Sequence, residues 1–546
     1  MAYILSRGSL DPGNNEPVDL KTCAWLSCFH LILYCIRSAP LHLRSFFLCC
    51  FNNGVQYRQL FQMVIVLGMS GTLLIGFQVS VITYPSQDIK SFINETWLQR
   101  HGVALSPDRL AVLWSFIISI YCLGGLLGCL WSGSLAMRYG KKKTLICSNF
   151  IIIVGALLVG SSKMARSFEI ILIGRFLYGI SAGLCLNIHG PYLSEISPKK
   201  FRGLATTTAA VFFSLGKALG QILGLRDLLG TEALWPLLLA LCGFPALLQL
   251  LLLPFFPESP PYLLLQRKDA DACRKAMKDL WGERHQQMEI EEALKEMTIA
   301  GSKNLSIWEV MKQRSLRWPL FIAILLVTSL QLCGLSAIYF YAFEVFRTAR
   351  LEELVIPYVT LGIGLCEFAS VLLCSSIIDR LGRRVLLWGG FGMMALTLAL
   401  LVLTLSLQDQ SPWISYSSIV LIFLFITFYG SGPSGAIFSV MVEIFHPDAR
   451  PSALALAGSF SWVGLFITGI SFPFVVEALG HYCFLVFFGV LIGMGLFTYL
   501  FIPETKGKSI LDIMEDLNRI PLGKRRTLPA LESSSPFRSH GLCTKL

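Results

Sequence analysis

Charged residues are scarce in this chain. Asp, Glu, Lys and Arg make up 14% of its 546 residues, whereas a soluble globular domain carries about 25%. This scarcity argues against a water-soluble enzyme or binding module. The formal net charge of +11 does not predict nucleic-acid binding either, because the basic residues lie in short loops between long apolar segments, a pattern typical of membrane topology.

Motifs that carry catalytic or metal chemistry are also missing. The sequence has no phosphate-binding glycine loop, no His-Glu-x-x-His pair and no nucleophile motif, so we expect neither enzymatic activity nor a cofactor. Its 16 cysteines show no metal-ligand spacing, and we predict no metal site. The loops expected outside the cell hold almost no cysteine, which argues against a disulfide framework.

What the chain has in abundance is long apolar segments. Hydrophobic residues make up 54% of it, in blocks of roughly 20 residues that can cross a hydrocarbon core about 30 Å thick as helices. The sequence therefore predicts an all-α membrane protein. We expect twelve spans, at about 61–84, 111–135, 144–161, 168–190, 204–225, 234–256, 319–342, 355–378, 385–407, 413–441, 452–476 and 481–502.

These spans divide the chain into five parts. The predicted parts are an N-terminal extension (1–57), a six-helix bundle (58–256), a charged linker with helical periodicity (257–318), a second six-helix bundle (319–503) and a tail (504–546). Arg37, His42 and Arg44 interrupt the apolar runs of the extension. We interpret it as a poorly ordered extension or a mis-predicted exon. The alternative is an interfacial helix palmitoylated at Cys49 or Cys50.

Lys and Arg predict the orientation in the membrane. They cluster after spans 2, 4 and 8 and in the tail, which places the even-numbered loops, the linker and both termini in the cytoplasm. The sequon at Asn94 then lies outside, where it is expected to carry a glycan, whereas the one at Asn304 should stay bare. The plasma membrane is the expected location.

Three short motifs occur twice, in the same order. The pairs are residues 138–142 and 380–384, Glu195 and Glu443, and Pro257–Ser259 and Pro503–Thr505. The copies are offset by 242, 248 and 246 residues, respectively. A six-helix unit repeated in the same orientation is the architecture of the major facilitator class, in which the two halves move against each other around a central site.

Charged residues near the helix ends are candidates for a cytoplasmic gate. We expect ion pairs among them to hold the two halves together when the cytoplasmic side is closed and to break when it opens. The alternative is that the basic residues only anchor helices at the inner face. The candidates are Glu169, Arg175, Glu195, Arg202, Arg138, Arg380, Arg384, Glu443, Arg450, Glu258 and Glu504.

Over roughly residues 60 to 515, the chain resembles the sugar porter family, and within it the facilitative glucose transporters. The motifs that carry the resemblance are Glu169 with Arg175 and Phe176, Pro257–Pro260, Gln331–Gly334, Asp379–Arg384, Gly432–Pro433 and Pro503–Gly507. Residues 224–229 are similar to the class II branch, which includes fructose carriers. The resemblance implies facilitated hexose transport by alternating access.

The resemblance also implies a sugar site between the halves. A hexose needs polar groups for its hydroxyls and an aromatic wall for its ring. Gln331 and Ser336 can both face the cavity if their helix breaks at Gly334. The other expected substrate contacts are Gln221, Gln78, Tyr341, Phe438 and Trp462. The sequence departs from the family at Leu330, Ala210, Ser336 and Phe438, so the cavity has been rebuilt.

Two ionisable residues fall within the predicted spans. Lys217 lies in the middle of span 5 and Glu367 in span 8, where the family usually has asparagine. Because a lone charge inside the bilayer is costly, we hypothesise that the two approach each other across the site, where both are expected to contact substrate. The alternative is that each finds water or backbone partners of its own.

Span 1 bears on energy coupling. Residues 61–87 contain neither Asp nor Glu, whereas proton-coupled sugar porters carry an acidic residue there. The sequence therefore predicts a passive uniporter of fructose or glucose, with the oligomeric state open and a functional monomer as the expectation. Two alternatives stay open, namely a carrier of an organic anion such as urate, for which Lys217 is the reason, and a sugar sensor that binds without transport.

Overall fold

The computed structural model describes most of the chain. The described residues are 58–198, 202–281, 290–291, 294, 305–340, 343, 346–347, 355–407, 412–445, 449–506, 508 and 510–519. The predictions for the extension 1–57, for the tail beyond residue 519, for Asn304 and for Tyr341 lie outside these residues.

Helices make up nearly all of the described structure. The first half contains α4 (Arg58–Ser70), α5 (Thr72–Ser80), η1 (Val81–Thr83), α6 (Ser86–His101), α7 (Pro107–Tyr139), α8 (Lys141–Ser161), α9 (Glu169–Ile196), α10 (Arg202–Leu223), α11 (Trp235–Ala240), α12 (Gly243–Leu252) and η3 (Leu253–Phe255). The second half contains α16 (Arg317–Leu332), α17 (Leu335–Phe340), α19 (Ile356–Leu381), α20 (Arg383–Ser406), α21 (Pro412–Tyr429), η5 (Gly430–Ser434), α22 (Gly435–Glu443), α23 (Arg450–Leu479), η6 (Gly480–Cys483) and α24 (Phe484–Phe501).

Their lengths and composition match the predicted spans. Among the described residues, 10 continuous helical stretches are long and apolar enough to cross a bilayer. One of them, Arg450–Phe501, contains both α23 and α24, and a shorter apolar stretch, Thr208–Leu223, forms most of α10. Separating the first and adding the second gives twelve, which confirms the predicted all-α membrane fold.

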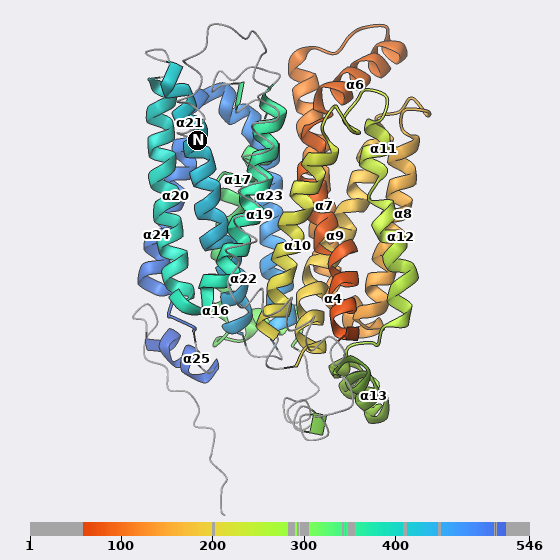
Figure 1. Ribbon diagram of the computed structural model, residues 1–546, viewed down its shortest axis with the longest axis vertical. Helices are drawn as coiled ribbons and strands as arrows, with labels where there is room; N and C mark the ends of the chain where they lie inside the picture. Colours follow the sequence, from red (N-terminus) through yellow and green to blue (C-terminus); the bar gives the residue numbers. More distant parts are fainter. Residues whose placement is uncertain are drawn as a thin grey trace, which may run out of the picture.

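The two halves form two bundles that stand side by side (Figure 1). They meet along two pairs of helices, with α7 packed against α23 and α10 packed against α19. The members of each pair come from different halves of the sequence. A site between the bundles is therefore built from residues that are far apart along the chain.

Glycine allows very close packing inside the first bundle. Gly124 and Gly128 of α7 face Gly179 and Gly183 of α9, each pair four residues apart. A Cβ atom on Gly128 would lie 2.0 Å from the carbonyl oxygen of Ile180. Because lipid supplies no hydrophobic drive for helix association, such small-residue contacts are what hold membrane helices together. They make this bundle a unit in which α7 and α9 share a backbone-to-backbone contact.

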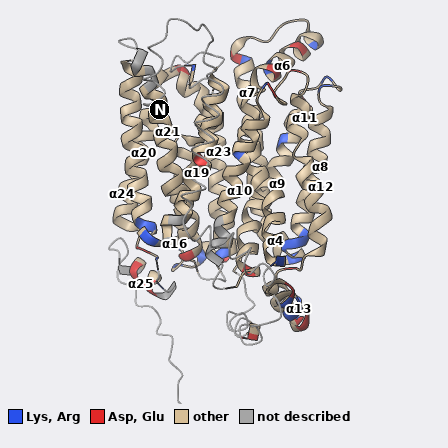
Figure 2. Cartoon of the chain, viewed as in Figure 1, with Lys and Arg blue, Asp and Glu red and all other residues tan. Residues whose placement is uncertain are grey.

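Charged side chains gather at the two ends of the bundles (Figure 2). The end that holds residues 141–143 and 380–384, here called the basic end, also carries α13 (Ala270–Trp281), α15 (Ile307–Lys312) and α25 (Ile510–Arg519). Helix α6 lies at the opposite end, here called the α6 end. Asn94 is on α6, where its Oδ1 accepts a hydrogen bond from the backbone of Leu105 at 3.0 Å.

The repeated motifs form the same turn in both bundles. Gly140 separates α7 from α8 and Gly382 separates α19 from α20, with φ and ψ of 92° and 160° at the first and 88° and 160° at the second. This region of backbone conformation is essentially restricted to glycine. In each turn a carboxylate accepts backbone N–H groups at the start of the next helix, Glu258 from Lys142 at 3.0 Å and Glu504 from Arg383 at 2.9 Å.

Alanine at Gly382 should therefore destabilise the protein. The backbone there disfavours any side chain, and a Cβ atom would lie 2.6 Å from Oε2 of Glu504. We expect Gly382→Ala to cost about 1–3 kcal/mol and to lower the melting temperature of the purified protein in detergent. Gly389→Ala is the matched control, since Gly389 lies within α20 with no atom within 4 Å of its added Cβ. Equal melting temperatures for the two variants would contradict this interpretation of the turn.

Candidate substrate site and charged helix ends

Span 7 breaks where the sequence predicts. Helix α16 ends at Leu332 and α17 begins at Leu335, with Gly334 between them at φ +96°. The break lets two polar side chains of this span meet, and Ser336 donates a hydrogen bond to Oε1 of Gln331 at 2.9 Å. Gln331 in turn donates to Ser461 of α23 at 2.9 Å. An amide and two hydroxyls therefore converge at the break.

An aromatic wall stands beside this polar group. Trp462, the neighbour of Ser461 in α23, is buried and packs edge-on against Tyr121 of α7, with ring centroids 5.5 Å apart. Its indole nitrogen and the Tyr121 hydroxyl have no hydrogen-bond partner among the described residues. Amide, hydroxyl and indole groups next to an aromatic face are the functional groups that a hexose site requires.

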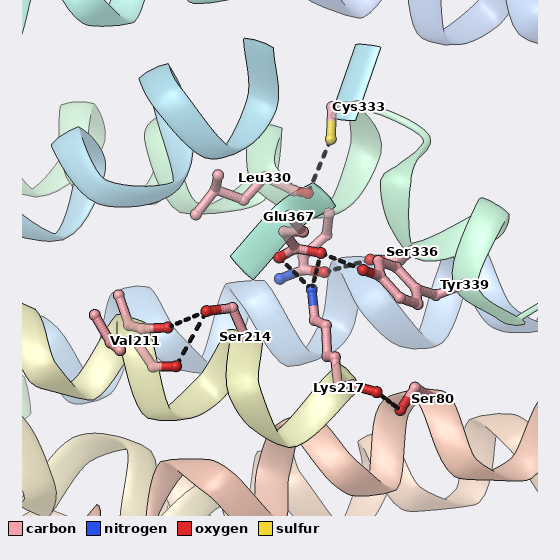
Figure 3. Close-up of polar contacts among 11 residues, drawn as sticks. Ser80, Val211, Ser214, Lys217, Leu330, Cys333, Ser336, Tyr339 and Glu367 are labelled. Carbon is pink, nitrogen blue, oxygen red and sulfur yellow. Dashed lines mark hydrogen bonds and ion pairs between the residues drawn. The ribbon is translucent and has the colours of Figure 1, made fainter. Parts of the chain in front are cut away.

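Lys217 and Glu367 form an ion pair between the bundles (Figure 3). Nζ of Lys217 on α10 lies 2.7 Å from Oε1 and 3.0 Å from Oε2 of Glu367 on α19. The hydroxyl of Tyr339 on α17 donates to Oε2 at 2.5 Å. The pairing hypothesised from the sequence is thus present in the structure, and the alternative of separate partners is not what the structure shows.

Burial makes this pair strongly interdependent. The two side chains are 4% and 1% exposed, and the ammonium also lies over the rings of Phe213 and Tyr339, at 4.8 Å and 4.4 Å from their centroids. A lone charge at this depth costs about 2.5–3.5 kcal/mol on insertion scales. Together the two charges cancel, so the ion pair adds no net charge to the centre of the molecule.

Further contacts join the bundles on both sides of the ion pair. Toward the α6 end, Thr83 donates to the carbonyl oxygen of Tyr339 at 2.7 Å, and Tyr84 donates to that of Pro357 at 3.0 Å. Toward the basic end, Sγ of Cys129 on α7 contacts the carbonyl oxygen of Ala455 on α23 at 3.2 Å. In this conformation the two bundles therefore touch above and below the centre.

The other predicted substrate contacts lie in different places. Gln221 is buried at the interface between the bundles, where a Cβ atom on Gly364 of α19 would lie 1.9 Å from its Oε1. Gln78 points into the first bundle and donates to Sγ of Cys242 at 2.8 Å. Phe438 of α22 is 45% exposed. The structure thus brings Gln221 toward the centre but does not place Gln78 or Phe438 with the buried cluster.

Sequence reasoning did not identify Ser461 and Tyr121 as members of this cluster. Ser461 directly precedes Trp462, which was recognised, so its position in the sequence was an available signal. No pattern in the sequence marks Tyr121, because it is one apolar-span residue among many and its role depends on the contact between α7 and α23.

At the basic end, each bundle carries one equivalent ion pair. Glu195 of α9 pairs with Lys141 of α8, and Glu443 of α22 lies 3.1 Å from Nη2 of Arg383 on α20. The two basic partners are 242 residues apart, the offset of the repeated loops. Both pairs join helices of the same bundle. The gate pairs expected between the bundles remain a prediction, and the sequence had named neighbouring arginines instead of Lys141 and Arg383.

The arginines named from the sequence contact backbone or rings. Arg384 donates to the carbonyl oxygen of Tyr499 at 2.5 Å, and Arg450 donates to that of Phe445 at 3.2 Å. The carbonyl oxygen of Arg380 accepts from Lys506, and the guanidinium of Arg138 lies 5.4 Å from the ring centroid of Tyr139. The side chain of Arg202 lies outside the described residues. Glu258 and Glu504 cap helices, as described above.

The assignment of Glu169 and Arg175 to this network is wrong. Glu169 begins α9 at the α6 end, 2.5 Å from Arg100 of α6. Glu195 lies 26 residues further along the same helix, about 39 Å away at 1.5 Å per residue. Arg175 is buried and donates from Nε to the carbonyl oxygen of Ile117 at 2.9 Å. The predicted topology already placed the loop before Glu169 on the opposite side from Glu195.

Removing one partner of the central ion pair should destabilise the protein more than removing both. Lys217→Met or Glu367→Gln leaves the other charge buried, which typically costs about 3–5 kcal/mol. The double substitution removes both charges, so we expect its melting temperature to lie closer to that of the wild type than either single variant. Thermal unfolding in detergent measures this double-mutant cycle.

The exposed ion pair Arg100–Glu169 is the control for that cycle. Its side chains are 40% and 45% exposed, and such pairs contribute about 0–1 kcal/mol. The variants Arg100→Gln and Glu169→Gln should show small and additive effects. Additive effects of similar size at Lys217 and Glu367 would contradict the interdependence of the central pair.

Comparisons with known proteins agree with this geometry. The human protein named solute carrier family 2, facilitated glucose transporter member 11, is 40% identical over 487 residues, which cover 89% of this chain and 98% of that protein. The mouse member 9 is 41% identical over 445 residues, or 81% of this chain and 83% of the relative. The horse member 5 is 38% identical over 439 residues, or 80% and 88%.

A solved structure shares the fold. The proton:xylose symporter XylE bound to 6-bromo-6-deoxy-D-glucose superposes with a TM-score of 0.70 at 20% sequence identity, covering 84% of this chain and 99% of that one. The family model described as Sugar (and other) transporter matches residues 62–517. The chain belongs to this family of membrane transporters.

Proposed function

We propose that this protein is a uniporter that carries a hexose, fructose or glucose, across the membrane by alternating access. The observation that carries the proposal is the convergence of Gln331, Ser336 and Ser461 beside Trp462, at the contact between the two bundles. The relatives named as facilitated glucose transporters support it.

The charge at the centre favours a neutral substrate. The reason to consider an organic anion was Lys217, but its ammonium is paired with Glu367 at 2.7 Å. A site whose ion pair is neutral offers no net attraction to an anion. We therefore rank the anion carrier and the non-transporting sensor below the hexose uniporter.

Alternating access follows from the contacts on both sides of the centre. The contacts at Thr83 and Tyr84 would break when the α6 end opens, and the contact between Cys129 and Ala455 when the basic end opens. We infer that the basic end is cytoplasmic, since Lys and Arg concentrate there. The plasma membrane, a glycan at Asn94, a functional monomer and the domain boundaries given above complete the proposal.

Uptake into liposomes tests the transported substrate. With purified protein in liposomes, we expect labelled fructose or glucose to enter until the internal and external concentrations are equal. An imposed proton gradient should not change that end point, because α4, α5 and η1 contain no Asp or Glu. Accumulation above the external concentration in acidic medium would contradict passive transport, and the absence of hexose uptake would contradict the proposed function.

Gln331 should contribute strongly to hexose uptake. Gln331→Leu removes the amide that connects Ser336 and Ser461, and an unmade hydrogen bond in a buried site costs about 1–3 kcal/mol. We expect hexose uptake at low concentration to fall roughly tenfold. The control is Gln99→Leu, an exposed glutamine on α6, which should transport like the wild type. Equal uptake by both variants would remove Gln331 from the site.

A further inference from the structure

The ion pair between Lys217 and Glu367 lies next to the proposed sugar contacts. Tyr339, which donates to Glu367, is three residues after Ser336 in α17 and therefore lies on the same side of that helix. Figure 3 shows Ser336, Tyr339 and the two charged side chains grouped between the helices of the two bundles. The pair and the amide–hydroxyl group thus share one region of the bundle interface.

We propose that the pair is an internal occupant of the sugar site in the empty carrier, which the substrate displaces, and that it selects neutral substrates with neighbouring hydroxyls. This inference rests on the proposed hexose transport and makes Lys217 and Glu367 specificity-determining residues. It goes beyond the amide and aromatic contacts because it assigns the selection to two opposite charges.

The pair must separate when the bundles move. The carbonyl oxygen of Lys217 accepts a hydrogen bond from Ser80 of α5 at 2.8 Å, so its backbone is fixed to the first bundle. Glu367 is on α19 of the second bundle, where Tyr339 of α17 also holds it. Because the two charges belong to different bundles, opening either end of the interface at this level pulls them apart.

Separated charges in a buried site need replacement partners. A sugar hydroxyl both donates and accepts hydrogen bonds. One hydroxyl of a hexose can donate to Glu367 while a neighbouring hydroxyl accepts from Lys217, so both charges stay hydrogen-bonded as the pair opens. No proton needs to move and no bond needs to form or break for this exchange.

Charged substrates fail the same requirement. An organic anion can replace Glu367 at Lys217, but it leaves the Glu367 carboxylate buried beside a second negative charge, with Tyr339 as its remaining donor. Like charges at this separation repel strongly where water is excluded. The ion pair therefore admits a neutral polyol and excludes an anion, although a lysine is present.

Charge-removing substitutions separate these effects. Uptake of labelled fructose, glucose and urate would be measured for the wild type, Lys217→Met, Glu367→Gln and the double variant, each in liposomes at equal protein content. We expect Glu367→Gln to lower hexose uptake roughly tenfold and to admit urate or be inhibited by it, since Lys217 is then unpaired. Lys217→Met should lower hexose uptake without any gain for urate.

The double variant and a charge exchange complete the design. With both charges removed, hexose uptake should fall by less than the product of the two single losses, and the gain for urate should disappear. If a single variant does not fold, Lys217→Glu/Glu367→Lys keeps a pair of opposite charges and should keep the exclusion of urate. Arg100→Gln/Glu169→Gln is the control and should leave uptake and selectivity unchanged.

Two results would overturn the proposal, and a third concerns the function beneath it. Losses in hexose uptake that simply multiply, or continued exclusion of urate by a folded Glu367→Gln protein, would show that the pair does not select the substrate. Both results presuppose that the wild type transports hexose. A wild type that takes up no hexose would instead overturn the proposed function.

Discussion

The contact between Lys217 and Glu367 places two opposite charges between bundles that otherwise meet through apolar and hydroxyl side chains. Neither charge is stable alone at that depth, so each bundle depends on the other for the partner of its charge. This dependence ties the position of α10 to that of α19 and brings Tyr339 to the same point. The central site is therefore organised by an interaction that neither bundle can make by itself.

The repeated motifs have a different role. Glu258 and Glu504 each cap the helix that follows a glycine turn, and Glu195 and Glu443 each pair with a basic residue at that turn. All of these contacts lie within one bundle. They make each bundle rigid at the basic end, which is what allows two bundles to move as units about the central pair.

The sequence predicted the fold almost completely. Apolar segments of membrane-spanning length and duplicated motifs gave twelve helices in two equivalent halves, because both features follow from local composition and spacing. The break at Gly334 was predicted for the same reason, since a glycine between Gln331 and Ser336 reports on backbone conformation directly.

The site was less predictable, because its members meet only through packing between the bundles. Lys217 and Glu367 could be paired from the cost of burying each alone, but Gln78 and Phe438 were placed at the centre by resemblance and lie elsewhere. Tyr121 became visible only once α7 was seen against α23. Glu169 was misplaced because the motif that contains it was considered without the direction of its helix.

A pair of structures, one without sugar and one with bound fructose or glucose, would test the central claim most directly. Cryo-electron microscopy of the protein in lipid nanodiscs at a resolution that shows side chains is suited to it. The account predicts that Nζ of Lys217 contacts the Glu367 carboxylate without sugar, and that sugar hydroxyls lie between them when it is bound. A sugar bound at Gln331 with the ion pair still closed, or bound elsewhere, would contradict it.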